Sequence, residues 1–291
     1  MPFSPAPAPA HSKPLVVFSH GNSFPASTYG VLFERLRARG FEVRAIEKFG
    51  HDPRYPVTSN WPHLVQQLAD FVSLEVEKSG QPAFLVGHSL GGFLSLMCAA
   101  LHPQLGGQKV AGVVMLDSPI VGGWRAAALS VAKRARLVGS VSPGAVSRRR
   151  RQQWLGRDEV LAHFRSKKAF AGWDEQVLRD YIDHGTHASE GTPQGQRLLS
   201  FDREVETAIY NTLPDNLESL LKNNPLQCPA AFIGGLASAE MKQVGMALTR
   251  RVTQGRLMML DGSHLFPMEQ PLATAAAIEA ALLNLMHLAG R

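Results

Sequence analysis

The sequence predicts an α/β fold, with a mostly parallel sheet of about six strands that is flanked by helices and interrupted by one helical insertion. Short apolar runs alternate with longer amphipathic segments, the order that produces parallel strands joined by helices. A Gly-His-Ser-Leu-Gly motif at residues 87–91 lies between such a run and a long apolar stretch. The alternation stops after residue 116 and resumes near residue 230. With 291 residues, 45% of them hydrophobic, the chain can form one large domain that carries an insertion.

Six short runs of apolar or β-branched residues are the expected strands. Strands of a parallel sheet are covered on both faces, so they read as continuous apolar runs. The runs are residues 15–18, 43–46, 84–86, 110–116, 230–233 and 257–260.

Two of the intervening segments have recognisable helix patterns. Asn60 is placed to cap a helix with Pro62 in its first turn, and Gly80 is placed to end it. The apolar side of this helix consists of Leu64, Leu68, Phe71 and Val72. A C-terminal helix follows Pro271, with an apolar stripe made of Ala275, Ile278, Leu282 and Leu285.

The break in the alternation predicts a helical cap at residues 121–215, which divides the core into residues 15–120 and 216–291. The segments 157–184 and 198–213 have helical patterning, and no convincing buried strand is found between them. Insertions of this size usually cover the carboxyl ends of the strands, where ligands bind. Five aromatic residues of the cap could form a pocket roof or simply the cap's own core: Trp154, Phe164, Phe170, Trp173 and Tyr181.

Composition favours a protein of a reducing, cytoplasmic compartment. The two cysteines give neither a disulfide framework nor a metal spacing. Residues 1–14, rich in Pro and Ala, read as a flexible leader, and no apolar run approaches the roughly 18 residues of a membrane span. The net charge of +6 lies in local clusters, so no nucleic-acid partner is expected. The oligomeric state is not encoded in any motif.

Two charged or histidine-containing motifs are interpreted as structural. The four arginines at residues 148–151 are expected to form a solvated face, although they could attract anionic substrates. His184 and His187 have a spacing compatible with metal binding on a helix, but the glycine between them and the loop after them argue against a preformed site. We therefore expect no metal and no cofactor.

The motif at residues 87–91 predicts a nucleophilic serine. Placed on a tight turn from strand to helix, Ser89 would be pushed out of the sheet with its hydroxyl exposed. An unassisted serine is a poor nucleophile at neutral pH and needs a base. His264 follows the last strand on a short Gly-Ser loop, which would bring it to the same sheet edge. The backbone amide of Leu90, at the start of the next helix, would stabilise an oxyanion.

Three motifs in this order resemble the α/β-hydrolases: Ser-His-Gly-Asn at residues 19–22, Gly-His-Ser-Leu-Gly-Gly at residues 87–92 and Gly-Ser-His at residues 262–264. The resemblance runs from about residue 15 to the C-terminus, with the cap poorly matched. It implies a serine hydrolase, esterase-like, that acts on small esters or related acyl compounds. It also implies a second oxyanion donor at Asn22, with Ser23 as the alternative. The family often begins with an antiparallel strand pair, which this chain lacks.

The acid that supports His264 has two candidates. The family's acid commonly follows the penultimate strand, yet residues 233–238 contain no carboxylate. Asp117 directly follows the run at residues 110–116 and is the preferred candidate. It lies at the carboxyl end of the strand beside the one that leads into Ser89, whose tight turn is here called the elbow. Its alternative role is to anchor the loop before Pro119. Glu240 is the second candidate for the acid, on a longer loop.

Three functions remain open on this evidence. The first is ester hydrolysis through an acyl-enzyme, with Ser89 as nucleophile and His264 as base. The second is C–C bond hydrolysis or cofactor-free peroxidation on the same fold. The third is a catalytically inactive, ligand-binding homologue. Dehalogenase and epoxide hydrolase chemistry is disfavoured because those relatives carry aspartate at the elbow.

Overall fold

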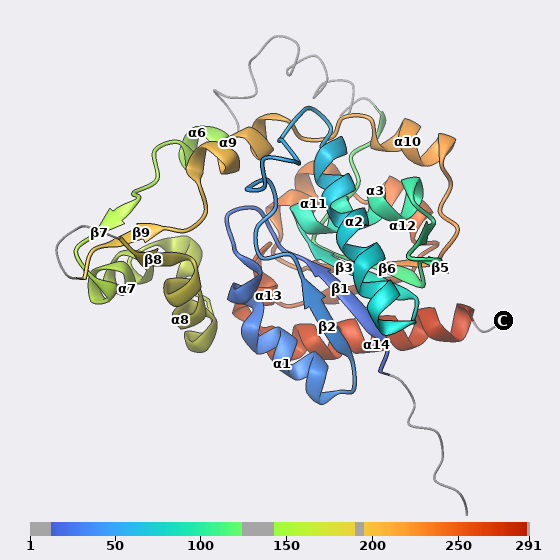
Figure 1. Cartoon of the computed structure of the whole chain (residues 1–291), viewed down its shortest axis with the longest axis horizontal. Coiled ribbons are helices and arrows are strands. Elements are labelled where there is room, and N and C mark those ends of the chain that lie inside the picture. Colours follow the sequence, from blue (N-terminus) through green and yellow to red (C-terminus); the bar gives the residue numbers. More distant parts are fainter. Residues whose placement is uncertain (1–12, 124–142, 190–194, 290–291) are drawn as a thin grey trace, which may run out of the picture.

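The structure is a computed structural model that describes residues 13–123, 143–189 and 195–289. Its centre is a parallel six-stranded sheet with the order β11-β10-β6-β3-β1-β2 (Figure 1). This confirms the predicted fold class. The strands are β1 (Leu15–Ser19), β2 (Glu42–Ala45), β3 (Ala83–His88), β6 (Gly112–Leu116), β10 (Ala230–Gly235) and β11 (Leu257–Leu260).

Helices cover both faces of this sheet. On one face lie α1 (Gly30–Ala38) and α14 (Pro271–Ala289), and on the other lie α2 (Pro62–Ser79) and α3 (Leu90–Leu101) (Figure 1). Successive side chains of a strand point to opposite faces. Val16 and Phe18 of β1 accordingly pack with α1 and α14, whereas Leu15 and Val17 pack with α2 and α3.

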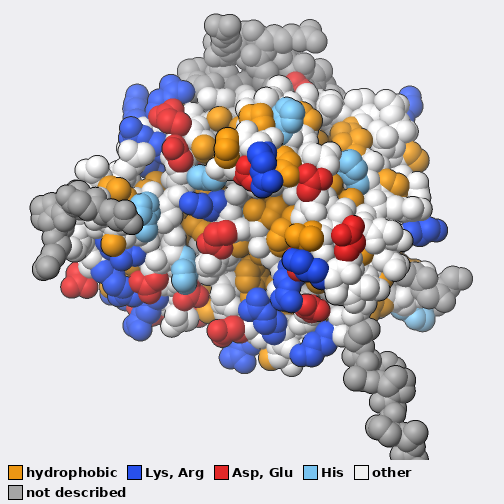
Figure 2. Space-filling model, viewed as in Figure 1, with side chains coloured by type: hydrophobic (Ala, Val, Ile, Leu, Met, Phe, Trp, Pro, Cys, Tyr) orange, Lys and Arg blue, Asp and Glu red, His pale blue; other side chains and the backbone are white. Residues whose placement is uncertain are grey.

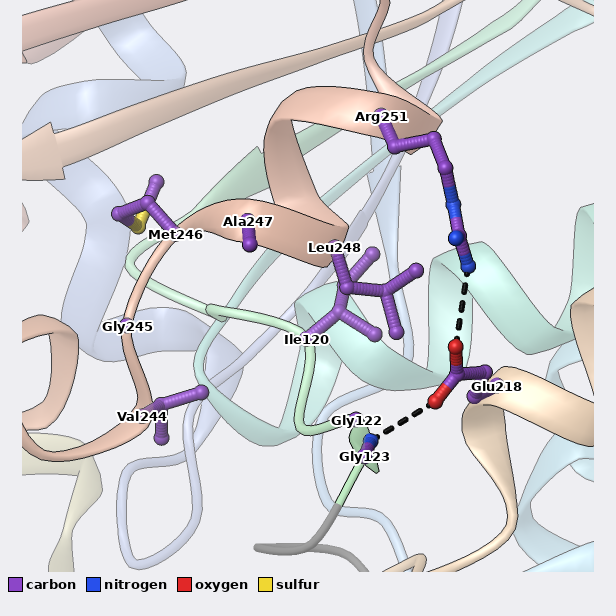
Figure 3. Close-up of a pocket in the computed structure, with 10 residues that line it drawn as sticks. All are labelled: Ile120, Gly122, Gly123, Glu218, Val244, Gly245, Met246, Ala247, Leu248 and Arg251. Atoms are coloured by element: carbon purple, nitrogen blue, oxygen red, sulfur yellow. Dashed lines mark hydrogen bonds and ion pairs between the residues drawn. The ribbon is translucent and has the colours of Figure 1, made fainter.

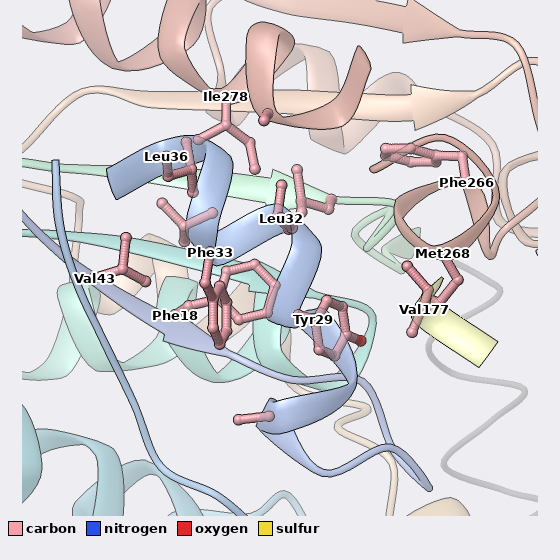
Figure 4. Close-up of a cluster of buried hydrophobic side chains, with 14 of the residues drawn as sticks. Phe18, Tyr29, Leu32, Phe33, Leu36, Val43, Val177, Phe266, Met268 and Ile278 are labelled. Atoms are coloured by element: carbon pink, nitrogen blue, oxygen red, sulfur yellow. The ribbon is translucent and has the colours of Figure 1, made fainter. Parts of the chain in front are cut away.

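The core under α1 is rich in aromatic side chains. Phe18 makes an edge contact with Phe33, and Tyr29 packs between α1 and the sheet (Figure 4). Tyr29 ends the 3-10 helix η1 (Ala26–Tyr29), which precedes α1. Phe266 and Met268 of α13 (Phe266–Glu269) extend this cluster toward the last strand. The loops after β1 and β11 are thereby packed on one continuous core.

Two predicted boundaries differ from the structure. The run at residues 110–116 enters the sheet only at Gly112, because the residues before it form a two-stranded hairpin of β4 (Gln104–Leu105) and β5 (Gln108–Lys109). Asn60 does not cap α2 with its side chain, which instead accepts a hydrogen bond from the Asp215 amide at 3.0 Å. Gly80 ends α2 as expected, with a φ of 69°.

The residues between β6 and β10, here called the inserted segment, contain short helices and a small sheet. The sequence shows no convincing buried strand there, and the three short strands that the structure contains, β7, β9 and β8, form an antiparallel sheet in which most residues are partly or fully exposed. Strands of two or three residues are too short to show an alternating pattern. The described elements of the inserted segment are α6 (Pro143–Ser147), β7 (Gln153–Trp154), α7 (Arg157–Arg165), η2 (Lys168–Phe170), α8 (Glu175–His184), β8 (Thr186–Ala188), β9 (Arg197–Leu199), α9 (Arg203–Asn211) and α10 (Leu217–Asn223).

Part of the inserted segment, α7, α8 and β7 to β9, forms a lobe to one side of the sheet (Figure 1). The lobe has its own aromatic core, in which Trp173 and Tyr181 contact Phe170. The cap boundaries at residues 121 and 215 and the leader at residues 1–14 remain predictions, since residues 1–12 and 124–142 lie outside the described part.

The C-terminal helix α14 is longer and more apolar than the sequence analysis allowed. Residues Pro271–Leu288 have a mean hydropathy of 1.3, enough in length and composition to cross a membrane. The expectation that no run approaches a span is wrong on that criterion. However, Ala275, Ile278, Leu282 and Leu285 of this helix are buried against the sheet and α1. The pattern is that of the core helix of a folded domain.

Charged side chains are mixed on the face shown in Figure 2. Lys and Arg side chains are interspersed with Asp and Glu, and apolar side chains lie between them (Figure 2). One member of the arginine run departs from the predicted solvated face, because Arg150 forms a largely buried ion pair with Glu206, at 2.5 Å.

Candidate active site

The Gly-His-Ser-Leu-Gly motif forms a strained turn between β3 and α3. Ser89 has φ 54° and ψ −115°, a conformation that L-residues rarely adopt and that costs on the order of 1–3 kcal/mol. Glycines make the turn possible. A Cβ atom at Gly87 would overlap the carbonyl oxygen of Gly91, and one at Gly91 would overlap that of Ser19. The close packing of β1, β3 and α3 therefore fixes the Ser89 side chain above the sheet.

His264 lies on the loop after β11, and its imidazole reaches the elbow. Its Nε2 is 3.0 Å from Ser89 Oγ, and its Nδ1 is 3.0 Å from Asp117 Oδ1. The loop approaches closely because Gly235, at the end of β10, has no side chain to collide with the Ser263 carbonyl. Ser89, His264 and Asp117 thus form a continuous hydrogen-bonded series.

Asp117 follows β6 and is fully buried. Its φ of 46° turns the chain sharply at the strand end. Besides His264, its carboxylate accepts hydrogen bonds from the Gly235 amide at 2.8 Å and from the Ser238 hydroxyl at 2.7 Å. Ser238 precedes the helix α11 (Ala239–Val244) and is the last residue of the stretch 233–238, which contains no carboxylate. The loop after β10 therefore contributes partners for the carboxylate of Asp117.

Glu240, the second candidate for the acid, is close to the same imidazole nitrogen. Its Oε2 lies 3.8 Å from His264 Nδ1, too far for a hydrogen bond, and its side chain is 45% exposed. The structure brings both predicted acids to His264, but only Asp117 is within hydrogen-bonding distance.

The protonation of the pair is set by burial and by the surrounding carboxylates. Burial by itself would lower the pKa of His264, but the hydrogen bond to Asp117 and the charges of Glu240 and Glu269 outweigh it and raise the pKa. Burial by itself would raise the pKa of Asp117, yet the hydrogen bonds from His264, Gly235 and Ser238 lower it. Asp117 is therefore an ionised carboxylate that favours the imidazolium form of its neighbour.

The predicted oxyanion donors lie on two loops beside Ser89. Leu90 is the first residue of α3, and Asn22 lines the cavity next to Ser89. Among the described residues, the backbone amides of Leu90 and Asn22 donate to no protein group. The Asn22 side chain points elsewhere, because its Nδ2 donates to the Glu206 carbonyl at 3.1 Å. Any contribution of Asn22 to an oxyanion site would come from its main chain.

The side chains of two buried histidines, His88 and His20, form hydrogen bonds with neighbouring segments of the chain. His88 Nε2 donates to the His264 carbonyl at 2.9 Å, and its Nδ1 accepts from Tyr29 Oη at 2.7 Å. Tyr29 Oη in turn accepts from the Gly21 amide at 2.9 Å. His20 Nε2 accepts from the Phe49 amide, and burial lowers the pKa of His20 to about 4. Through these contacts both histidines support loops around the site.

A cavity of about 650 Å³ opens beside Ser89 and His264. The inserted segment contributes Lys168 and Ala169 of η2 and Tyr210 of α9 to its wall. The five aromatic residues proposed as a roof do not line this cavity. They pack on one another, and Trp173 and Tyr181 touch Phe24, which does line the cavity. The alternative interpretation, that they form the core of the inserted segment, describes the structure.

A second cavity, of about 280 Å³, lies away from Ser89 (Figure 3). It is bordered by residues 244–248 and by Ile120, and Glu218 accepts hydrogen bonds there from the Gly123 amide and from Arg251. None of the predicted site residues lines it. The chemistry predicted from the sequence is therefore confined to the first cavity.

One group of side chains in the described part could hold a metal ion. Asp117, Glu240 and His264 each offer a ligand atom, and these atoms lie within 4.8 Å of one another. A metal on His264 Nδ1 would displace the proton that this nitrogen shares with Asp117. Metal binding and the hydrogen-bonded series to Ser89 are thus mutually exclusive arrangements. His187, which the sequence analysis interpreted as structural, lies with its Nδ1 3.3 Å from Ser200 Oγ.

The family model described as alpha/beta hydrolase family matches residues 16–277. The chain belongs to this family. The crystal structure of E-2-(acetamidomethylene)succinate hydrolase superposes on it with a TM-score of 0.68, at 22% identity, covering 92% of this chain and 91% of that one. The resemblance inferred from the three short motifs is thereby confirmed.

Curated proteins that are similar to this chain include proteins named as monoglyceride lipases or their homologues. The monoglyceride lipase homologue of Monkeypox virus is 26% identical over 180 residues, 58% of this chain and 63% of that protein. Monoglyceride lipase of Rattus norvegicus is 26% identical over 209 residues, 69% of this chain and 62% of that protein. The chain therefore spans a little under two thirds of the length of these relatives.

Sequence reasoning missed the residues that hold the site together. Glu206 and Arg150 come from the inserted segment, and Tyr29 is an ordinary aromatic residue of a helical pattern. Lys168 belongs to an exposed pair of lysines with no distinguishing motif. Two of these residues carried a local signal: Ser238 is an N-cap serine that follows the penultimate strand, and Arg150 belongs to the run of four arginines.

Proposed function

We propose that this hydrolase cleaves carboxylic esters or related acyl compounds through an acyl-enzyme, with Ser89 as nucleophile, His264 as base and Asp117 as acid. The observation that carries the proposal is the series of two 3.0 Å contacts, Ser89 Oγ to His264 Nε2 and His264 Nδ1 to Asp117 Oδ1. A serine hydroxyl with a base in hydrogen-bonding reach, itself oriented by a carboxylate, is the arrangement of an activated nucleophile.

The first half of the reaction forms the acyl-enzyme. His264 Nε2 takes the proton of Ser89 Oγ as this oxygen bonds to the substrate carbonyl carbon, and the carbonyl oxygen becomes an oxyanion. Asp117 keeps the Nδ1 proton in place and stabilises the imidazolium. The new Nε2 proton passes to the alkoxy oxygen of the substrate as the C–O bond breaks, and the alcohol leaves.

The second half releases the acid. His264 Nε2 takes a proton from a water molecule as the water oxygen bonds to the acyl carbon. The imidazolium then returns that proton to Ser89 Oγ as the bond between Oγ and the acyl carbon breaks. Both halves pass through an oxyanion, for which the amides of Leu90 and Asn22 are the proposed donors. Each such donor typically contributes about 3 kcal/mol to transition-state stabilisation.

The cavity supports a small or medium-sized substrate. Its volume of about 650 Å³ lies within the common range for small-molecule sites. The relatives that are named monoglyceride lipases make monoacyl esters of glycerol sensible first substrates beside p-nitrophenyl esters of increasing chain length.

Labelling with a fluorophosphonate probe, followed by peptide mapping, tests the proposal. We expect the label on Ser89, and we expect Ser89→Ala to abolish both labelling and ester hydrolysis. Ser118→Ala, which alters a nearby serine that bonds the Ser89 carbonyl, should leave the labelled peptide unchanged. A wild-type protein that neither takes the label at Ser89 nor hydrolyses any ester of the panel would favour the ligand-binding homologue instead.

A further inference from the structure

Glu206 of α9 joins the inserted segment to the loop that follows β1. Its side chain accepts a hydrogen bond from Ser23 Oγ at 2.5 Å, and its backbone carbonyl accepts one from Asn22 Nδ2 at 3.1 Å. Tyr210, one helical turn further along α9, lies close to the Ser23 side chain. One face of α9 thus holds two consecutive residues of the loop that carries the proposed Asn22 donor.

The loop needs such support because its backbone is unfavourable on its own. Ser23 has a φ of 81°, in the left-handed region that residues with a side chain avoid. Strained conformations of this kind persist only where surrounding contacts determine them. The contacts of Ser23 with α9 hold this conformation in place, directly next to the Asn22 amide.

A buried cation fixes the orientation of the Glu206 carboxylate. Arg150 Nη1 donates to Glu206 Oε2 at 2.5 Å, and Arg150 Nη2 donates to Tyr181 Oη at 2.7 Å. The Glu206 side chain is only 4% exposed and that of Arg150 18%. Charges this far removed from water are maintained only when they are paired. With Oε2 bonded to Arg150, the other carboxylate oxygen is directed at Ser23.

We propose that Glu206, oriented by Arg150, is a positioning residue that sets the oxyanion loop for catalysis. This inference rests on the proposed function, since the loop matters for rate only if Ser89 forms an oxyanion. Through Glu206 the inserted segment contributes to the geometry of the reaction centre as well as to the wall of the cavity. Its contribution acts on the transition state and leaves ground-state binding of the substrate unchanged.

Two variants test this role, and one serves as a control. Ser23→Ala removes the hydroxyl that meets Glu206 and leaves the ion pair with Arg150 intact, so the buried charges stay paired. Glu206→Gln removes the charge itself. Asp183→Asn breaks the exposed ion pair between Asp183 and Arg157 in the same lobe, where the aspartate is 45% exposed, and is expected to behave like the wild type.

For Ser23→Ala and Glu206→Gln, we expect kcat on p-nitrophenyl acetate to fall by about tenfold or more with KM within about threefold, because an ångström-scale misplacement can cost up to about 100-fold. Hydrogen exchange of peptides that cover residues 19–26 should be faster in Ser23→Ala than in the wild type and in Asp183→Asn.

Unchanged exchange in that loop, or a kcat within about twofold of the wild type in a folded Ser23→Ala protein, overturns the inference. The exchange measurement does not depend on turnover. Faster exchange of the loop in a protein that shows no label on Ser89 would support the structural part of the inference while the proposed function fails.

Discussion

Asp117 and His264 lie 147 residues apart in the chain, and their side chains meet at 3.0 Å, at the end of two strands that are not adjacent in the sheet. The buried Asp117 carboxylate has three hydrogen-bond donors around it, whereas Glu240 approaches the same imidazole nitrogen only to 3.8 Å from a half-exposed position. Burial and hydrogen bonding strengthen an electrostatic interaction, and exposure weakens it. This difference leads to the first prediction.

Asp117→Asn should lower kcat by about 100-fold or more, whereas Glu240→Gln should change it by less than about threefold. The asparagine cannot stabilise the imidazolium and can hold the wrong tautomer of His264. Steady-state hydrolysis of a short p-nitrophenyl ester measures both. The reverse order of effects would assign the acid to Glu240 and leave Asp117 as an anchor of its loop.

Replacing Glu240 should shift the acidic limb of the pH profile of kcat/KM, although it should leave kcat at the pH optimum nearly unchanged. His264 acts as a base only when deprotonated, so kcat/KM falls as the pH drops through its pKa, which is raised above the ordinary value of 6.5. The negative charge of Glu240 contributes to that rise. Glu240→Gln should therefore move the acidic limb to lower pH. Glu279→Gln, which removes a partly exposed glutamate of α14 that pairs with Arg39, should leave the limb in place.

Local patterns were sufficient for the sheet and for Ser89, because a strand, a tight glycine turn and an apolar helix occur consecutively in the sequence. His264 and Asp117 were predictable because each follows a strand, and the carboxyl ends of parallel strands meet at one edge of the sheet. Neither required knowledge of a distant contact.

The supports of the site could not be predicted in this way. Arg150 occurs in a run of arginines whose other members are partly or fully exposed, and only the packing of α9 on the oxyanion loop makes it a buried partner of Glu206. Tyr29 joins Gly21 to His88 through one hydroxyl group, a contact that depends on how η1 lies on the sheet. The short strands of the inserted segment likewise depend on pairing between distant residues.

The buried histidines should make the protein sensitive to mild acid. Burial lowers the pKa of His20 to about 4 and that of His88 to about 3, whereas both would titrate near 6.5 once unfolded. Below pH 6.5 the unfolded chain binds protons that the fold excludes, so stability falls until the folded pKa values are reached. At pH 5 the loss is about 2 kcal/mol for each histidine.

Urea unfolding between pH 7.5 and pH 5 measures this loss. His20→Asn should lower the overall stability. It should also reduce the dependence of stability on pH, because it removes one of the two histidines that take up a proton on unfolding. His63→Asn, at an exposed position of α2, should retain the wild-type dependence. A pH dependence that is the same for His20→Asn and the wild type would contradict the prediction.

Gly91→Ala should destabilise the protein by about 3 kcal/mol or more, as expected for severe overpacking. Alanine is favoured over glycine within a helix by about 1 kcal/mol. Here, however, the added Cβ would overlap the Ser19 carbonyl, and this clash makes the net effect of the substitution destabilising. Gly156→Ala, where the nearest group would be in ordinary contact at 3.7 Å, should cost about 1 kcal/mol at most. Urea unfolding of both variants gives the comparison, and equal stabilities would refute the packing argument.

The wall that η2 adds to the cavity should control which acyl chains are accepted. Ala169 lines the cavity beside Ser89, whereas Ala171, two residues further on, is exposed and does not line it. Ala169→Trp would fill part of the roughly 650 Å³ with an indole ring. We expect kcat/KM for octanoyl esters to fall about tenfold or more relative to acetyl esters, the size of discrimination that a filled apolar pocket provides. Ala171→Trp should keep the wild-type ratio. If both variants keep it, acyl chains bind on another side of the cavity, and η2 has no part in selectivity.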